Sequence, residues 1–301
     1  MLTCNASILG GWRNDPREVE RSLKSLPRPW FASEASHLFG TGADRTILLY
    51  KAFKDVNSGQ YPEYPAQQIG DCVSQSFGHG VDLLEAVQIV LQNRPDLWVP
   101  TATEAIYGMA RVDIGGLRDF EQDGAVGAWG ARAVSTLGTL SRTLVGPYDG
   151  RRAKEWGAKG VPPELAAKAS AHKVRTCSLV STYSQIEDAL ANGYPVTVCS
   201  PQGFSSQRDS DGFCLPQGIW NHAMLIVGVR ADTRPGACFF QSWGPYVPVG
   251  PLVLDQPGNS FWVDRGIVEQ MIGAGDSWSL SNFEGYPKQD LPARWSYVGF
   301  A

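Results

Sequence analysis

The stretch Asn221-His222-Ala223-Met224-Leu225-Ile226-Val227-Gly228-Val229 is followed by Phe239-Phe240-Gln241-Ser242-Trp243-Gly244. His222 leads into an apolar run that predicts a strand, so its imidazole is expected at the mouth of that strand. The amide of Gln241 can accept a hydrogen bond from this ring, and Trp243 can shield the bond from water. Such an arrangement holds an imidazole in one tautomer, which a thiol nucleophile requires of its base.

The candidate nucleophile is Cys72, in the sequence Gly70-Asp71-Cys72, 150 residues before His222. Apolar residues recur at intervals of three and four from Cys72 to Asn93, which predicts a helix that begins at the thiol. The free backbone N–H groups and the dipole at a helix start stabilise a thiolate. A second histidine, His79, falls about two helical turns further along and is interpreted as a packing residue.

Two glutamines precede the nucleophile, Gln67 and Gln68. A side-chain amide at this position, together with the backbone N–H of Cys72, can form an oxyanion hole for a tetrahedral intermediate. In an extended loop the two side chains point to opposite sides, so only one of them can serve. Gln67 is the favoured donor, and Gln68 is the alternative.

These residues, in this order, resemble the papain family and its calpain-like relatives. Gly70-Asp71-Cys72 is similar to calpains in particular, and the resemblance covers roughly residues 61–265. The other stretches that carry it are Gln67-Gln68-Ile69, Gly146-Pro147-Tyr148, Gly193-Tyr194-Pro195-Val196, Asn221-His222-Ala223 and Gln241-Ser242-Trp243-Gly244.

The resemblance implies an α+β, two-lobed papain-like fold. A helical lobe, about residues 61–175, would begin with the Cys72 helix and pack against a β-barrel-like lobe, about residues 176–301. The active site would lie between the lobes, bordered by Trp220 and by the loop of residues 202–217. Residues 1–60 would be an N-terminal extension, acting either as a prosegment over the site or as an arm that docks on an assembly partner.

Three departures from the family pattern bear on activity. The orienting residue of the family is usually asparagine, and Gln241 is one methylene longer. The oxyanion glutamine usually stands six residues before the cysteine, where this chain has Ala66, so the role passes to Gln67 only with a one-residue slip of the loop. The tryptophan that commonly follows the nucleophile is replaced by Val73.

Composition and cysteine spacing bear on which partners, compartments and metal sites are expected. The 301 residues carry a net charge of −4, which is not the basic footprint of a nucleic-acid-binding protein. No apolar run is long enough for a membrane span, and the N-terminus lacks a signal-peptide pattern. The six cysteines show no paired spacing, so neither a disulfide framework nor a zinc site is expected. We therefore expect a cytoplasmic or particle-associated protein with reduced thiols, no metal and no cofactor.

The leading hypothesis is a cysteine peptidase or amide hydrolase that acts on a peptide or protein through an acyl-thioester intermediate. Cys72 would be the nucleophile, His222 the base, Gln241 its orienting group and Gln67 the oxyanion donor. Acyl transfer to an amine uses the same residues. The competing hypothesis is a weakly active or inactive papain-like structural protein, for example a component of a phage particle. The Ile69-Gly70-Asp71-Cys72 segment and the absence of a disulfide pattern are compatible with a phage or prophage origin.

Overall fold

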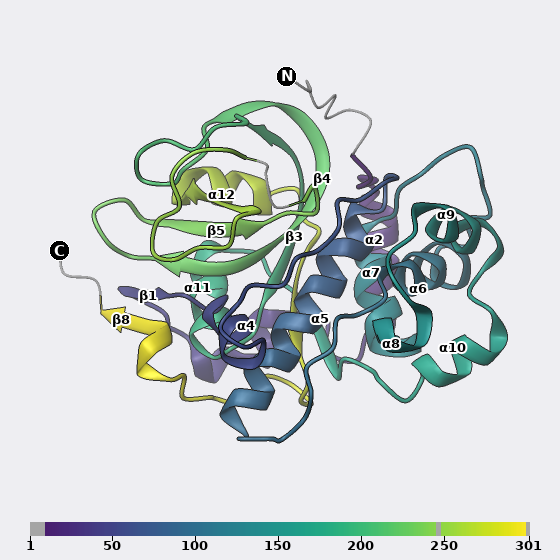
Figure 1. The fold of residues 1–301 in the computed structure, drawn as a ribbon, viewed down its shortest axis with the longest axis horizontal. Coiled ribbons are helices and arrows are strands. Elements are labelled where there is room, and N and C mark those ends of the chain that lie inside the picture. The colour runs from purple at the N-terminus through teal and green to yellow at the C-terminus, as the bar shows by residue number, and fades with distance from the viewer. Residues whose placement is uncertain (1–9, 245–247, 299–301) are drawn as a thin grey trace.

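The computed structural model describes residues 10–244 and 248–298. Helices from the first half gather on one side, strands gather on the other, and helix α5 (Cys72–Leu91) lies between them (Figure 1). This is the mixed, two-part architecture that the sequence predicts. The helices of the first side, besides α5, are α2 (Pro16–Ser25), α6 (Thr103–Gly108), α7 (Gly127–Arg132), α8 (Arg142–Val145), α9 (Gly150–Lys159) and α10 (Pro163–Ala169).

Shorter helical elements complete the chain. Helices α6 and α7 each run on into a π-helical stretch, which is η2 (Met109–Ile114) after α6 and η3 (Ala133–Leu137) after α7. The remaining helical elements are α3 (Phe31–Glu34), η1 (Ser36–Leu38), α4 (Lys51–Val56), α11 (Tyr183–Ala191), α12 (Arg265–Ile272) and η4 (Ala293–Trp295).

Helix α5 is the central element of the core. Most of its side chains are buried, including residues on every face, so it is enclosed by protein rather than lying on the surface. A Cβ added at Gly78 would lie 2.5 Å from Thr103 Cγ2 of α6, and one added at Gly80 would lie 3.2 Å from Leu225 Cδ1. Glycine at these two positions therefore lets the helical side and the sheet both approach α5 closely.

The strands form one branched sheet. They are β1 (Arg45–Ile47), β2 (Thr176–Leu179), β3 (Val196–Phe204), β4 (Pro216–Arg230), β5 (Gly236–Phe240), β6 (Ser260–Asp264), β7 (Ser277–Ser281) and β8 (Ser296–Val298). The path β2-β7-β3-β4-β1-β8 forms the main sheet, and β5 and β6 extend from β4. The expected β-barrel-like lobe is an open sheet among the described strands: the main path ends at β2 and at β8, and β5 and β6 branch off at β4.

Strand register positions the candidate base. In the antiparallel β3–β4 pair, Ser200 stands opposite His222, and the register shifts just beyond this pair. On the other edge of β4, Leu225 pairs with Phe240, the last residue of β5. The start of the apolar half of β4 and the end of β5 therefore lie at the same end of the sheet, which brings His222 and Gln241 into one region.

Residues 10–60 contact both sides of the molecule. Trp12 forms a parallel bridge with Ala125, just before α7. Ile47 of β1 pairs with Val229 of β4. The N-terminal stretch thus runs from the helical side to the sheet, and its division from the rest of the chain at residue 60 remains a prediction.

Five of the six cysteines lie in the described residues, and all five are buried free thiols. The sixth, Cys4, lies outside the described residues. Within residues 10–244 and 248–298, every helix is too short or too polar to span a bilayer.

Candidate active site

Cys72 occupies the first position of α5 and is fully buried. Its Sγ accepts a hydrogen bond from the backbone N–H of Ala223, at 3.4 Å, across 151 residues of sequence. Burial raises the pKa of the thiol to about 12 and the Asp71 charge adds to the rise, whereas backbone hydrogen bonds, that of Ala223 first among them, oppose it. The structure therefore brings the thiol beside the strand that carries His222, in a protonated state at neutral pH.

His222 is buried in β4, next to the residue that contacts the thiol. Its ring packs against the Trp243 ring, with centroids 4.6 Å apart and planes tilted by 31°. Neither ring nitrogen has a hydrogen-bond partner within the described part of the chain. Burial lowers the pKa of His222 to about 3, so the imidazole is neutral.

Gln241 turns its amide toward its own loop. The side-chain oxygen accepts the backbone N–H of Trp243, and Nε2 lies 3.4 Å from the carbonyl oxygen of Gly244. The longer side chain thus folds back, and none of the hydrogen bonds of the described residues joins it to His222. Trp243, by contrast, lies against the imidazole as predicted, and its ring also contacts that of Trp220, with centroids 4.5 Å apart.

The two candidate oxyanion glutamines have different surroundings. The Gln67 backbone N–H donates to the Ser242 carbonyl at 2.8 Å, its side-chain oxygen accepts the Ser242 hydroxyl, and its Nε2 donates to the Ile69 carbonyl at 2.9 Å. Gln68 instead accepts the backbone N–H of Gly150 at 3.0 Å, on the helical side. Gln67 therefore lies between the helical side and the strand side of the molecule, whereas the side chain of Gln68 contacts the helical side.

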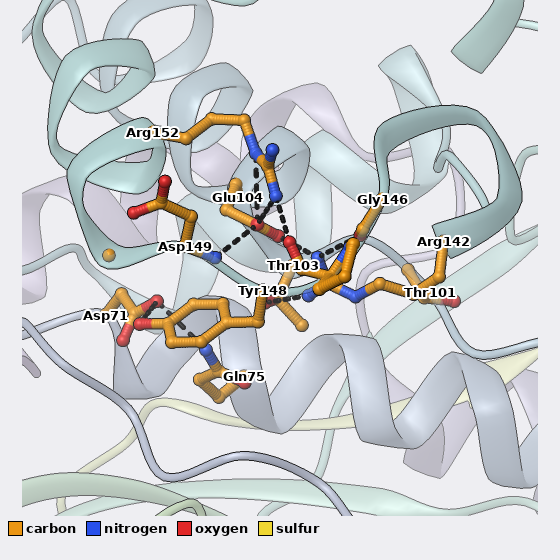
Figure 2. Close-up of polar contacts among 12 residues, drawn as sticks. Asp71, Gln75, Thr101, Thr103, Glu104, Arg142, Gly146, Tyr148, Asp149 and Arg152 are labelled. Atoms are coloured by element: carbon orange, nitrogen blue, oxygen red, sulfur yellow. Dashed lines mark hydrogen bonds and ion pairs between the residues drawn. The ribbon is translucent and has the colours of Figure 1, made fainter.

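A buried polar network that the sequence did not predict surrounds Asp71, the residue before the candidate nucleophile (Figure 2). The Asp71 carboxyl is fully buried, and one of its oxygens accepts bonds of 3.0 Å from both Gln75 Nε2 and the Tyr148 hydroxyl. The Tyr148 hydroxyl in turn accepts the backbone N–H of Gln68 at 3.1 Å. Burial raises the pKa of Asp71 to about 7. Gly146-Pro147-Tyr148 was the available signal, but it did not indicate this contact.

The same network continues to a buried carboxylate on α6. Glu104 pairs with Arg142 and Arg152, and the Arg152 Nη2 lies 2.8 Å from a Glu104 oxygen (Figure 2). It also accepts the backbone N–H of Asp149 at 3.1 Å, next to Tyr148. Glu104 thus fixes the loop that carries Tyr148.

Residues 10–13 lie across the candidate site. The backbone N–H groups of Gly11 and Trp12 donate to the Asn221 carbonyl, at 3.1 and 2.9 Å, directly before His222. The backbone N–H of Arg13 donates to the Ala125 carbonyl at 2.9 Å, and the backbone N–H of Ala125 donates to the Gly11 carbonyl at 2.8 Å. A Cβ added at Gly11 would lie 2.1 Å from the Gly70 carbonyl oxygen. The backbone of Gly11 also lowers the pKa of the Cys72 thiol slightly, against the rise caused by burial. The segment therefore lies against residues that flank both the nucleophile and the candidate base.

His79 lies apart from this chemistry. The His79 ring is buried between Tyr64 and Phe240, at centroid distances of 4.0 and 5.3 Å, which confirms its packing role. In residues 10–244 and 248–298, His, Cys, Asp and Glu side chains form no group of three that could hold a metal ion.

No protein-family model and no curated protein sequence matches this chain significantly. Solved structures do match it. Xylellain, a cysteine protease from Xylella fastidiosa, is 15% identical, with a TM-score of 0.58 over 93% of this chain and 98% of that chain. Digestive procathepsin L 3 of Tenebrio molitor is 14% identical, with a TM-score of 0.54 over 92% and 77%. Bromelain from Ananas comosus is 14% identical, with a TM-score of 0.50 over 79% and 98%. These likenesses establish a divergent papain-like fold.

Proposed function

We propose that this chain, with its papain-like fold, is a cysteine peptidase or a closely related amide hydrolase. The observation that carries the proposal is the 3.4 Å contact between the Ala223 backbone N–H and the Cys72 sulfur. It joins the first residue of α5 to the neighbour of His222. A thiol at a helix start beside an imidazole is the pairing that cysteine activation by a general base requires.

The proposed reaction begins when Cys72 transfers its proton to His222 and its sulfur attacks the carbonyl carbon of an amide. The tetrahedral intermediate collapses as the C–N bond breaks, and His222 gives the proton to the departing amine. Water, activated by His222, then attacks the acyl-thioester and releases the acid and the free thiol. An amine in place of water would give acyl transfer through the same residues.

In this proposal Gln241 and Gln67 serve the reacting groups after local rearrangement. The Gln241 amide would turn from Trp243 to the neighbouring His222 ring and orient it. Gln67 is favoured over Gln68 as the oxyanion donor because it contacts Ser242, which lies on the strand side opposite α5. Its Nε2 would leave the Ile69 carbonyl to meet the intermediate.

The N-terminal stretch would act as a cover rather than as a docking arm. Residues 10–13 bond on one side to Asn221, beside the base, and on the other to Ala125. With this segment in place the thiol is buried and its pKa is raised. Displacement of the segment would admit solvent and substrate, lower the thiol pKa and raise that of His222.

A specific observation also supports the structural-protein alternative. The thiol is fully buried, and the His222 ring nitrogens have no partner among the described residues. An assembly protein that retains the fold without its activity, such as a phage component, would tolerate that arrangement permanently. The two proposals differ in whether uncovering Cys72 produces a reactive thiol.

The test is thiol labelling with an iodoacetamide-type probe near pH 6, mapped by mass spectrometry. Gly11→Ala should displace the cover, because its Cβ would overlap the Gly70 carbonyl oxygen. We expect Cys72 in this variant to react about tenfold faster or more than the other cysteines. Adding His222→Ala should abolish the excess, and quenched peptides should be cleaved only while His222 is present.

Gly266→Ala is the matched control, since an added Cβ there meets no atom within 4 Å. It should label like the unchanged protein. If Cys72 in Gly11→Ala becomes accessible at alkaline pH but shows no excess reactivity near pH 6, the peptidase proposal is wrong and the structural alternative stands.

A further inference from the structure

Helix α5 packs against the neighbouring strands β3 and β4 (Figure 1). Two contacts show how the helix and the strands are aligned. The backbone N–H of Ala223 in β4 donates to the Cys72 sulfur at 3.4 Å, at the start of α5. One helical turn further on, the Ser76 hydroxyl donates to the Thr197 hydroxyl of β3 at 3.2 Å, and both groups are buried. The Thr197 side chain therefore lies on the face of β3 that meets α5.

A second cysteine, Cys199, lies on the same face of β3. It follows Thr197 by two residues in a stretch of regular pairing, and side chains two apart on a strand share a face. It also stands directly opposite Ala223, whose N–H contacts the Cys72 sulfur. Two strand residues span about 6.6 Å, and the helical turn between Cys72 and Ser76 spans about 6 Å. Cys199 thus faces Cys72 as Thr197 faces Ser76.

The electrostatics of Cys199 agree with this placement. Burial raises the pKa of the Cys199 thiol, and the charges of Asp276 and then Cys72 raise it further, so Cys72 lies in its surroundings. Both cysteines are free thiols with no exposed surface. A disulfide requires Cβ atoms about 3.5–4.5 Å apart. The hydroxyl contact one turn away shows that α5 and β3 approach closely enough for side chains of this length to meet.

We propose that Cys199 is the partner thiol of Cys72 in a reversible disulfide that forms when hydrogen peroxide oxidises the nucleophile. The Cys72 thiolate attacks one peroxide oxygen, the O–O bond breaks, and the released hydroxide takes up the proton that Cys72 lost. The Cys199 sulfur then attacks the sulfur of the Cys72 sulfenic acid. The S–O bond breaks, and the hydroxyl group leaves as water with the Cys199 proton. Two thiols and one peroxide thus give one disulfide and two waters.

The disulfide would regulate the candidate site. It occupies the sulfur that would attack a substrate, so activity stops until a dithiol reductant restores both thiols. It also prevents oxidation of the Cys72 sulfenic acid to the sulfinic acid, which such a reductant does not reverse. This consequence for activity rests on the proposed function, whereas the bond between the two sulfurs does not.

The first test looks for the bond itself. The full chain, with and without Gly11→Ala, is treated with hydrogen peroxide and alkylated in denaturant without reductant. Digestion with trypsin and chymotrypsin then separates Cys199 from Cys177, because Tyr194 lies between them. We expect a peptide pair joined through Cys72 and Cys199 that dithiothreitol separates. Absence of this pair from both chains would overturn the inference, whatever the oxidation state of Cys72.

The second test measures protection of the nucleophile. After peroxide and then dithiothreitol, Cys199→Ser should return about tenfold less free Cys72 thiol than the unchanged protein, because its sulfenic acid oxidises further. Cys177→Ser is the matched control, since it removes another buried free thiol, on β2. It should match the unchanged protein. Equal recovery in all three would overturn the inference, and if Cys199→Ser does not fold, the cross-linked peptide decides.

This inference and the peptidase proposal fail separately. A Cys72–Cys199 cross-link in a chain that cleaves no peptide before oxidation, even with Gly11→Ala, would remove the peptidase function and leave the thiol pair intact. Peptide cleavage that peroxide abolishes and dithiothreitol does not restore, with no cross-link formed, would support the peptidase and overturn the role of Cys199.

Discussion

Asp71 stands directly before the candidate nucleophile, where two electrostatic effects oppose each other. The start of α5 favours a thiolate at Cys72, whereas the Asp71 charge adds to the burial that raises the thiol pKa. Asp71 is itself buried, and its own pKa is raised to about 7, chiefly by desolvation. Its protonation near neutral pH would therefore remove a negative charge beside the thiol.

Tyr148→Phe should destabilise the protein, and more so above pH 7 than below it. The Tyr148 hydroxyl lowers the pKa of Asp71 by donating to its carboxyl, so the bond is strongest when Asp71 is ionised. We expect a loss of about 1 kcal/mol in unfolding free energy at pH 5.5 and about 2 kcal/mol at pH 8.5. Urea denaturation at the two pH values measures both.

Tyr297→Phe serves as the control, because that side chain lies at the exposed edge strand β8 and no bond to its hydroxyl occurs among the described residues. It should change stability by less than about 0.5 kcal/mol at either pH. A Tyr148→Phe effect that is equal at the two pH values would mean that the hydroxyl does not act through ionised Asp71.

Among the elements, α6 and α9 are joined by a carboxylate that has no contact with solvent. Glu104 on α6 pairs with Arg152 of α9 and with Arg142 of α8, whose side chains are 25% and 18% exposed. Glu104 holds the loop between α8 and α9 through its bond to the Asp149 backbone N–H. Tyr148 of that loop donates to Asp71, the residue before the candidate nucleophile, so Glu104 is connected to Cys72 through this chain of contacts.

Glu104→Gln should lower the unfolding free energy by about 2–3 kcal/mol, since it leaves two guanidinium groups without their counter-charge. The partial exposure of both arginines keeps the loss below that of a fully buried pair. Glu155→Gln breaks an exposed pair with Lys159 and should cost less than about 0.5 kcal/mol. Urea denaturation of the two variants measures both losses of unfolding free energy. Equal losses would mean that the buried Glu104 carboxylate stabilises the fold no more than an exposed one does.

Helices and strands marked by a regular spacing of apolar residues could be predicted from the sequence, whereas a strand rich in small polar residues could not. The predicted helix over 72–93 is α5, because apolar side chains recur along it. The predicted strand over 224–229 covers only part of β4, which begins at Pro216 with exposed residues. Strand β7 was missed, because Ser277–Ser281 contains three serines, yet pairing with β2 and β3 buries it completely.

The same division applies to the candidate site. Cys72 and His222 could be predicted as candidate site residues because each has a reactive side chain in a recognisable local setting. The contact of Trp12 with Asp276 spans 264 residues, so no local pattern could indicate it. The place of residues 10–13 beside the site could not be predicted for the same reason, because their bonds to Asn221 and Ala125 are backbone contacts that any sequence can make.

Across the whole molecule, buried titratable groups pull stability in opposite directions as pH changes. Burial lowers the pKa of His79 and of His222 to about 3, so the unfolded chain binds more protons than the folded one between pH 3 and 6.5. Burial raises the pKa of Asp71 to about 7 and of Asp82 to about 6, so there the folded state binds more protons as pH falls from 7 toward 4. Acid therefore weakens the fold through the histidines and strengthens it through the carboxyls.

His79→Phe separates these contributions, because it keeps an aromatic ring between Tyr64 and Phe240 but cannot take up a proton. The stability of the unchanged protein relative to this variant should be constant above pH 7. It should then fall by up to about 1.4 kcal/mol for each pH unit between 6.5 and 4, because only the unchanged protein has a histidine here to protonate on unfolding. Urea denaturation at pH 7.5, 6, 5 and 4 gives the difference, with exposed His172→Gln as the control. A difference that stays flat down to pH 4 would mean that His79 is already protonated, or hydrated, in the folded core.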